Sequence, residues 1–157
     1  MIAPPNVAPI TKSIRVKTTP ERAFEVFTTD LIKWWPPSYT IGTSPMKEVV
    51  VEPRLGGRWF EIGEDGSQCQ WGDVLAWDPP RRVVLAWRIG MDWQFDPSLL
   101  TEVEVTFKQV GGETEVRIVH SKFENYGADA EKAAEIFDGW SATLVRFADV
   151  VHGRTPQ

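Results

Sequence analysis

The sequence predicts one domain of the α+β class, in which a curved antiparallel sheet of about seven strands is closed by a helix. Segments that alternate between polar and apolar residues follow one another through the middle of the chain, as in antiparallel strands with one buried face. Residues 128–152 carry apolar side chains at helical spacing instead. Eight tryptophans in 157 residues indicate either a very aromatic core or an apolar hollow lined with aromatic rings.

The first three elements are predicted to be a strand and two short helices. Residues 13–18 alternate between apolar and polar side chains, so we expect a half-buried strand there. Thr19 can cap the helix that follows, and Pro20 suits its first turn because proline lacks the N–H that would be left unpaired. A second helix, at about residues 29–35, is stopped by two prolines.

Six more strands are expected between these helices and the last one. They are predicted at residues 47–52, 58–62, 68–77, 82–89, 101–109 and 114–122. Glycine or proline pairs separate most of them and favour turns. Simple alternation places Phe107 and His120 on the inward face of the last two strands.

The final helix is predicted over residues 128–152 and ends at Gly153. Its apolar residues fall on one stripe: Ala133, Ile136, Phe137, Trp140, Leu144, Phe147 and Val151. We expect residues 12–153 to form the domain, with tails at residues 1–11 and 154–157. No internal repeat or long linker indicates a second domain.

Charge and cysteine content exclude several classes of protein. The net charge of −5 argues against a nucleic-acid surface, which needs basic residues to neutralise phosphates. Cys69 is the only cysteine, so neither an intrachain disulfide nor a thiolate metal cluster can form. The N-terminus does not have the pattern of a signal peptide, and no apolar stretch approaches the ~20 residues that span a bilayer. We therefore expect a cytoplasmic protein with no membrane insertion.

A series of short motifs extends from about residue 13 to residue 152. They are Ala23-Phe24, Phe27-Thr28-Thr29, Trp34-Trp35-Pro36, Gly56-Gly57-Arg58-Trp59, Asp65-Gly66, Gly72-Asp73-Val74, Asp78-Pro79-Pro80-Arg81-Arg82, Trp87, Thr101-Glu102-Val103, His120-Ser121 and Gly139-Trp140. Their order and spacing resemble the START-like superfamily, also called SRPBCC, and within it the branch of the activator of heat-shock-protein-90 ATPase. The resemblance implies a helix-grip fold, in which the sheet wraps around a long C-terminal helix and leaves a cavity between them.

The resemblance also implies three kinds of function. Many relatives bind apolar small molecules, so the first expectation is a small apolar or aromatic ligand bound between the sheet and the final helix. Some wider relatives are aromatase/cyclases that act on polyketides, which makes a cyclase- or dehydratase-like enzyme an alternative. The eukaryotic namesake is a co-chaperone, but it uses an additional N-terminal domain for which 157 residues leave no room. A co-chaperone-like interaction module or a homodimer would instead expose a contiguous apolar patch.

The residues expected to contact the ligand come from inward strand positions and from the stripe of the final helix. They are Trp59, Trp71, Trp87, Phe107, His120, Trp140 and Leu144. The alternative is that the tryptophans among them fill the core. Trp34 and Trp35 are expected to pack the short helix at the mouth, and the loop with Trp93 and Phe95 is either a flap over the entrance or an exposed hairpin tip.

His120 offers the most chemistry among the polar residues. A neutral histidine on the inward face can orient a ligand or act as a general base near pH 7. The other interpretation, which we favour, is a structural histidine bonded to the backbone or to a nearby hydroxyl group. Asp73 and Glu61 are the inward carboxylates that could pair with it, unless a β-bulge reverses either assignment.

Other chemistry has little support in the sequence, and we assign no catalytic residue. Cys69 and His120 could form a nucleophile and its base, but a lone cysteine on a strand usually packs in the core. His120 and His152 are too few and too far apart for a metal site. No phosphate-binding glycine loop precedes a helix, so we expect no cofactor. Arg88 is expected to be solvated or to form a salt bridge.

Overall fold

A seven-stranded antiparallel sheet is the framework of residues 7–156, the part of the chain that the computed structural model describes. The strand order is β1-β7-β6-β5-β4-β3-β2. The strands are β1 (Ile10–Val16), β2 (Met46–Val51), β3 (Arg58–Gly63), β4 (Gln68–Asp78), β5 (Arg82–Trp87), β6 (Thr101–Val110) and β7 (Glu113–Ser121). Neighbours in the sheet are also neighbours in the chain, except for β1, which pairs with β7.

The helices come in two groups that pack together. α1 (Pro20–Thr28) and α2 (Leu31–Trp34) follow β1, and the 3-10 helix η1 (Phe123–Asp129), α3 (Ala130–Ile136) and α4 (Trp140–Val151) follow β7. α4 contacts α1, α2 and β1. This arrangement of a curved sheet around a C-terminal helix confirms the α+β, helix-grip class predicted from the sequence.

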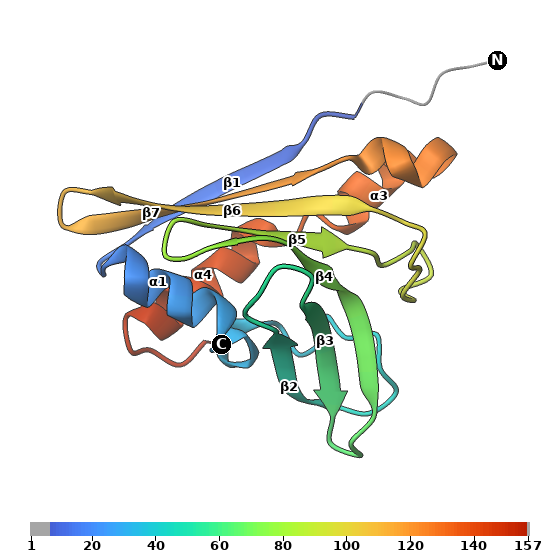
Figure 1. The fold of residues 1–157 in the computed structure, drawn as a ribbon, viewed down its shortest axis with the longest axis horizontal. Coiled ribbons are helices and arrows are strands. Elements are labelled where there is room, and N and C mark those ends of the chain that lie inside the picture. Colours follow the sequence, from blue (N-terminus) through green and yellow to red (C-terminus); the bar gives the residue numbers. More distant parts are fainter. Residues whose placement is uncertain (1–6, 157) are drawn as a thin grey trace.

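The sheet is strongly bent, and the bend holds the helices. Figure 1 shows β1, β7 and β6 extending along the long axis, whereas β2, β3 and β4 turn away across them. α4 lies within the bend, next to α1. The side chains between the sheet and the helices therefore come from both layers, and this space is the core of the domain.

β1 begins earlier than predicted. The alternation that marks residues 13–18 is absent from Thr11-Lys12, yet Ile10 pairs with His120 and the ladder continues to Val16. The extension comes from pairing with β7, a tertiary contact that local alternation does not report. Residues 1–6 of the predicted N-terminal tail and residue 157 lie outside the described part of the chain.

The prediction of one continuous helix over residues 128–152 was wrong. The chain forms α3 and α4, and between them Phe137 and Gly139 have non-helical backbone angles. Glycine is a poor helix former. A Cβ at position 139 would lie 2.8 Å from the Tyr39 hydroxyl oxygen, so Tyr39 packs against bare backbone at this junction.

β4 carries a bulge that decides which of its side chains face inward. Trp59 pairs with Gly72 and Phe60 pairs with Gln70, so Trp71 is an additional residue in the ladder. The extra residue shifts the alternation after it, and Asp73 points outward instead of inward as predicted. Its carboxylate forms an ion pair with Arg88, which agrees with the salt bridge expected for that arginine.

Aromatic rings fill the interior. Trp34, Trp59 and Trp71 are each no more than 1 % exposed, and the rings of Trp59 and Trp71 lie 5.2 Å apart at their centroids. The hollow expected between the sheet and the helices is therefore largely filled by aromatic and aliphatic side chains, tryptophans among them.

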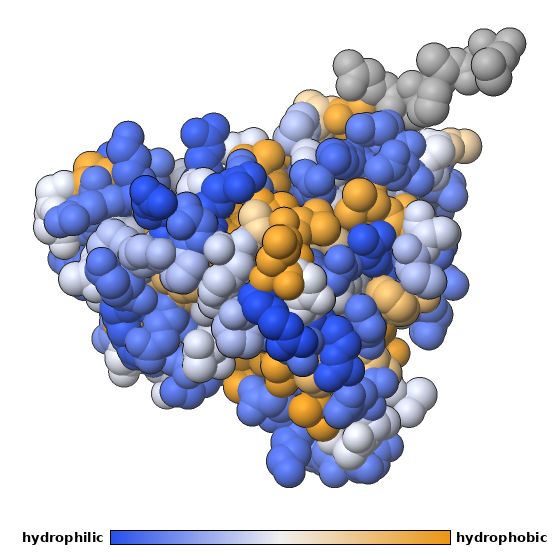
Figure 2. All heavy atoms as spheres, viewed as in Figure 1, coloured by the Kyte–Doolittle hydropathy of each residue, from blue (hydrophilic) through white to orange (hydrophobic). Residues whose placement is uncertain are grey.

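No helix within residues 7–156 has the length and apolar character that crossing a membrane requires. Figure 2 shows a face of the molecule on which hydrophilic side chains predominate, with hydrophobic ones gathered near its centre.

Candidate functional site

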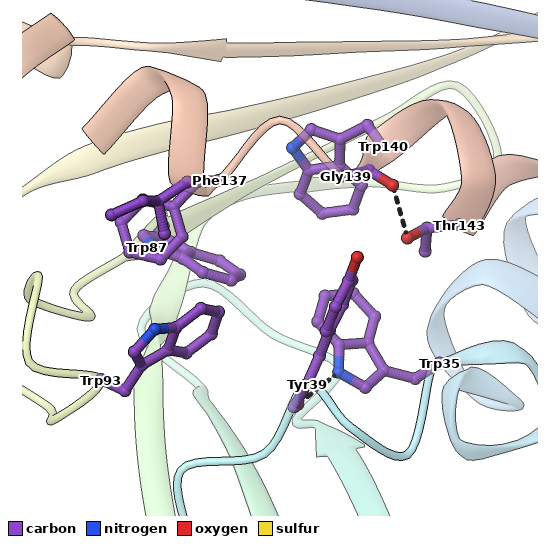
Figure 3. A pocket seen from close by; sticks show the side chains of 9 residues that line it. Trp35, Tyr39, Trp87, Trp93, Phe137, Gly139, Trp140 and Thr143 are labelled. Carbon is purple, nitrogen blue, oxygen red and sulfur yellow. Dashed lines mark hydrogen bonds between the residues drawn. The ribbon is translucent and has the colours of Figure 1, made fainter. Parts of the chain in front are cut away.

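An aromatic cleft opens where the helical layer meets the loops at one end of the sheet (Figure 3). It is lined by Trp35, Tyr39, Trp87, Trp93, Ile136, Phe137, Gly139, Trp140 and Thr143. These residues come from the segment after α2, from β5, from the β5–β6 loop and from both sides of the α3–α4 junction. Its open volume is about 30 Å³, which is room for one or two water molecules.

One wall of the cleft is the segment that follows α2. The indole N–H of Trp35 donates a 2.8 Å hydrogen bond to the carbonyl oxygen of Tyr39, which holds both rings at the opening. The Trp35 ring also packs against Trp71 and Trp140, with centroid distances of 5.0 and 5.8 Å. The absence of a side chain at Gly139 leaves space for the Tyr39 ring.

The opposite wall is the β5–β6 loop with Trp93 at its tip. The Trp93 ring meets Phe137 edge-on at 5.2 Å. Its backbone has φ of 59°, a left-handed conformation that is uncommon for a residue other than glycine. The backbone N–H of Gly90 donates to the carbonyl oxygen of Gln94, and that of Trp93 donates to the carbonyl oxygen of Gly90. These bonds close the turn, and the Trp93 side chain lines the cleft.

The base of this loop is fixed by Arg88. Its Nε lies 2.6 Å from a carboxylate oxygen of Asp73, and its Nη1 donates to the carbonyl oxygens of Pro97 and Leu99. A guanidinium group that links a strand to two loop carbonyls restricts how far the loop can move as a unit.

His120 lies directly behind the cleft and takes part in a closed hydrogen-bond network. The Thr101 hydroxyl donates to the carbonyl oxygen of Trp87 at 2.9 Å, so it accepts from His120 Nε2, also at 2.9 Å. The indole N–H of Trp140 donates to His120 Nδ1 at 3.3 Å. This arrangement requires the neutral tautomer with its proton on Nε2.

Burial keeps His120 uncharged. The side chain is 0 % exposed, and desolvation lowers the pKa of His120 to about 3. Both ring nitrogens are occupied and the ring does not line the cleft, so the structural interpretation of this histidine is confirmed. The network holds two cleft walls, the backbone of Trp87 and the ring of Trp140.

Glu61 points into the core, as predicted, but it is remote from His120 in the hydrogen-bond network. Its side chain is 1 % exposed and accepts hydrogen bonds from the backbone N–H of Ile41, the indole N–H of Trp71 and the hydroxyl of Thr40. These bonds tie the segment after Tyr39 to β3 and β4. No group of three or more histidine, cysteine or acidic side chains in residues 7–156 is placed to hold a metal ion.

Comparison with known proteins identifies the family. The family described as activator of Hsp90 ATPase homolog 1-like protein matches residues 17–152. The chain belongs to this family. It therefore belongs to the START-like superfamily that its motifs resemble. A search of curated proteins found no match.

Solved structures of the same architecture include a synthase and a resistance protein. The anthrahydroquino-gamma-pyrone synthase Txn09 is 38 % identical, and the match covers 92 % of this chain and 97 % of Txn09 with a TM-score of 0.66. The self-sacrificing resistance protein CalC from Micromonospora echinospora is 27 % identical over 96 % of this chain and 98 % of CalC, with a TM-score of 0.72. The Aha1 dimer from Colwellia psychrerythraea shares the fold at 21 % identity over 92 % of this chain and 96 % of that protein, with a TM-score of 0.63.

In this member of the family, two of the seven predicted ligand contacts, Trp87 and Trp140, line the cleft. The other five are buried in the core and do not line it: Trp59, Trp71, Phe107, His120 and Leu144. The sequence reasoning did not assign Tyr39, Phe137 or Thr143 to the site. Their contribution depends on the break between α3 and α4 and on a loop contact, and no local pattern reports either of these.

Proposed function

We propose that this protein binds a small apolar or aromatic molecule at the aromatic cleft. The observation that carries the proposal is the lining itself, in which six aromatic rings from four segments converge on one opening: Trp35, Tyr39, Trp87, Trp93, Phe137 and Trp140. Aromatic side chains provide a large contact area for flat or apolar ligands at low entropic cost.

The present volume of the cleft means that binding requires movement of its walls. About 30 Å³ is far below the ~300 Å³ or more that drug-sized ligands occupy. Trp93 is the wall most able to move, because it is only half-buried and lies on a loop, whereas Trp87 and Trp140 are fixed by the His120 network. We therefore place ligand entry at Trp93.

Thermal denaturation in the presence of neutral aromatic probes tests this function. Naphthalene and 9,10-anthraquinone should raise the melting temperature, since a ligand that binds only the folded state stabilises it. Trp93→Ala should weaken probe affinity about tenfold through loss of one aromatic contact. Trp77→Ala is the matched control, because Trp77 is also half-buried but packs against Phe24 outside the cleft.

Two outcomes would count against binding at this place. If none of the probes changes the melting temperature or the tryptophan fluorescence, the proposed function fails. If Trp93→Ala and Trp77→Ala weaken binding equally, the ligand occupies another part of the molecule.

A second candidate is polyketide cyclase-like catalysis in the same cleft, favoured by the 38 % identity with the synthase Txn09. The polar side chains of the lining are few, and the hydroxyl of Thr143 already donates to the carbonyl oxygen of Gly139. The hydroxyl of Tyr39 is therefore the group to test. Conversion of an anthrahydroquinone substrate that is lost in Tyr39→Phe, with substrate binding retained, would support catalysis.

A homodimer and a cytoplasmic location remain predictions. The dimer has the support of one relative of the same fold that is named as a dimer. Among the described residues, the large hydrophobic side chains that are most exposed are Leu55, Ile136 and Val145, which lie on separate elements. Light scattering at micromolar concentration would give the mass of the particle directly, and a monomeric mass would remove the homodimer and weaken the interaction-module alternative.

A further inference from the structure

The aromatic cleft contains no charged side chain, although the protein around it is acidic. Its lining has five π systems of tyrosine or tryptophan, one phenylalanine and no lysine, arginine, aspartate or glutamate. The faces of such rings carry partial negative charge and attract cations, most strongly at tryptophan. The net charge of −5 favours the approach of a cation over that of an anion.

A buried carboxyl group, that of Glu61, lies behind Trp71, which itself packs against the lining residue Trp35. The Glu61 carboxyl group accepts hydrogen bonds from the backbone N–H of Ile41, the indole N–H of Trp71 and the hydroxyl of Thr40. No ion pair within residues 7–156 involves it. A buried charge without an opposite charge is costly and is rarely retained without a partner.

Glu61 is connected to the cleft through two neighbouring indoles, whose ring planes are tilted by 39°. The N–H of Trp71 donates to the Glu61 carboxylate at 3.0 Å, and the Trp71 ring lies 5.0 Å from the ring of Trp35, which lines the cleft. Thr40 and Ile41, which also bond to the carboxylate, adjoin Tyr39 on the same wall. The negative potential of Glu61 therefore reaches the cleft through a low-dielectric interior.

We propose that the cleft holds a fully alkylated ammonium group, such as a trimethylammonium head, with Glu61 as its buried counter-charge. This inference rests on the proposed function, because it assigns a chemical class to the ligand of the same site.

The lining explains why the nitrogen should be fully alkylated. A primary ammonium has three N–H donors that need acceptors, but the side chains of the lining offer only the hydroxyls of Tyr39 and Thr143, because indole N–H groups can only donate. A trimethylammonium group has no N–H, is large enough to touch several rings and leaves no donor unpaired. It is also more compact than a fused-ring ligand, so it requires a smaller displacement of Trp93 and Tyr39 from the present 30 Å³ opening.

The ionisable side chains around the cleft do not oppose the binding of a cation there. His120, which lies behind Trp87 and Trp140, is neutral in its hydrogen-bond network. Arg88, at the base of the Trp93 loop, is paired with Asp73. Asp92 and Glu135, which adjoin the lining residues Trp93 and Ile136, are exposed to solvent, whereas Glu61 is buried behind the cleft.

A pair of probes with the same shape and different charge tests the inference. Phenyltrimethylammonium and tert-butylbenzene differ by one positive charge, and their affinities can be compared by fluorescence titration of the tryptophans. We expect the cation to bind at least about tenfold more tightly. Equal or weaker binding of the cation would overturn the inference and leave the proposed function standing, whereas no binding of either probe would remove both.

Glu61→Gln tests the counter-charge, with Glu64→Gln as its control. The control makes the same chemical change in the same hairpin, but Glu64 is exposed. We expect Glu61→Gln to weaken the cation about tenfold and to leave tert-butylbenzene nearly unchanged, and Glu64→Gln to change neither. If Glu61→Gln weakens both probes equally or fails to fold, Glu61 acts structurally and its counter-charge role is rejected; the probe pair in the unchanged protein still decides the ligand class.

Discussion

His120 illustrates how one residue can hold the walls of a cleft without lining it. Its strand position made it a candidate for ligand contact or proton transfer, and that position is as predicted. Its partners decide the role, because Thr101 and Trp140 occupy both ring nitrogens. The partners come from β6 and α4, and their identity could not be read from the sequence around position 120.

The burial of His120 predicts a dependence of stability on pH. The pKa of His120 falls from 6.5 to about 3 on folding, so between these values the unfolded chain binds a proton that the folded protein does not. The stability of the folded protein with a neutral His120 is therefore fully present above pH 6.5, and part of it is lost as the pH decreases from 6.5 toward 3. The free energy of unfolding should therefore decrease by about 1.4 kcal/mol per pH unit below about pH 6.

Urea denaturation between pH 5 and 7 measures this slope, a range in which most carboxylates stay ionised. His120→Gln should lower the stability at pH 7 and flatten the slope. His152→Gln, which removes the other histidine of the chain, should leave the slope in place. An unchanged slope in His120→Gln would show that the pH dependence has another origin.

At the scale of elements, the predictions that succeeded depended on local pattern, and those that failed depended on contacts. The cap of α1 by Thr19 is a local signal and was predicted. The stripe of the last helix continues in register through Phe137 and Trp140 and predicted one helix across Gly139, whereas the chain breaks there and Tyr39 packs against the break. The bulge at Trp71 likewise turned the side chain of Asp73 on β4 outward, whereas the side chain of Glu61 on β3 points inward as predicted.

The bulge in β4 depends on glycine at position 72. A Cβ there would lie 1.7 Å from the carbonyl oxygen of Ala86, so only glycine lets β4 approach β5 this closely. Gly72→Ala should therefore lower the free energy of unfolding by about 3 kcal/mol or more. Gly112→Ala, in a turn where a Cβ meets no atom within 4 Å, should change stability by less than about 1 kcal/mol.

Thermal or urea denaturation of the two variants checks this directly. Similar stability of Gly72→Ala and the unchanged protein would contradict the close approach of β4 and β5, and with it the outward orientation of Asp73.

At the scale of the whole molecule, the tryptophans both fill the core and form the entrance. The strand tryptophans that the sequence placed around a hollow instead occupy it, as Trp59 and Trp71 show. The aromatic cleft lies where residues distant in sequence meet, including Trp35, Trp93 and Phe137. Such a site emerges only when the sheet has bent and the helices have packed, so alternation in single strands could not locate it.

The central claim is that ligands enter the aromatic cleft and contact the rings that line it. Two-dimensional NMR of the indole N–H groups during titration with phenyltrimethylammonium or tert-butylbenzene tests this most directly, because each of the eight tryptophans contributes its own signal. The signals of Trp35, Trp93 and Trp140 should shift in proportion to occupancy while that of Trp77 stays in place. Shifts at Trp77 with no change at Trp35 and Trp93 would contradict the account.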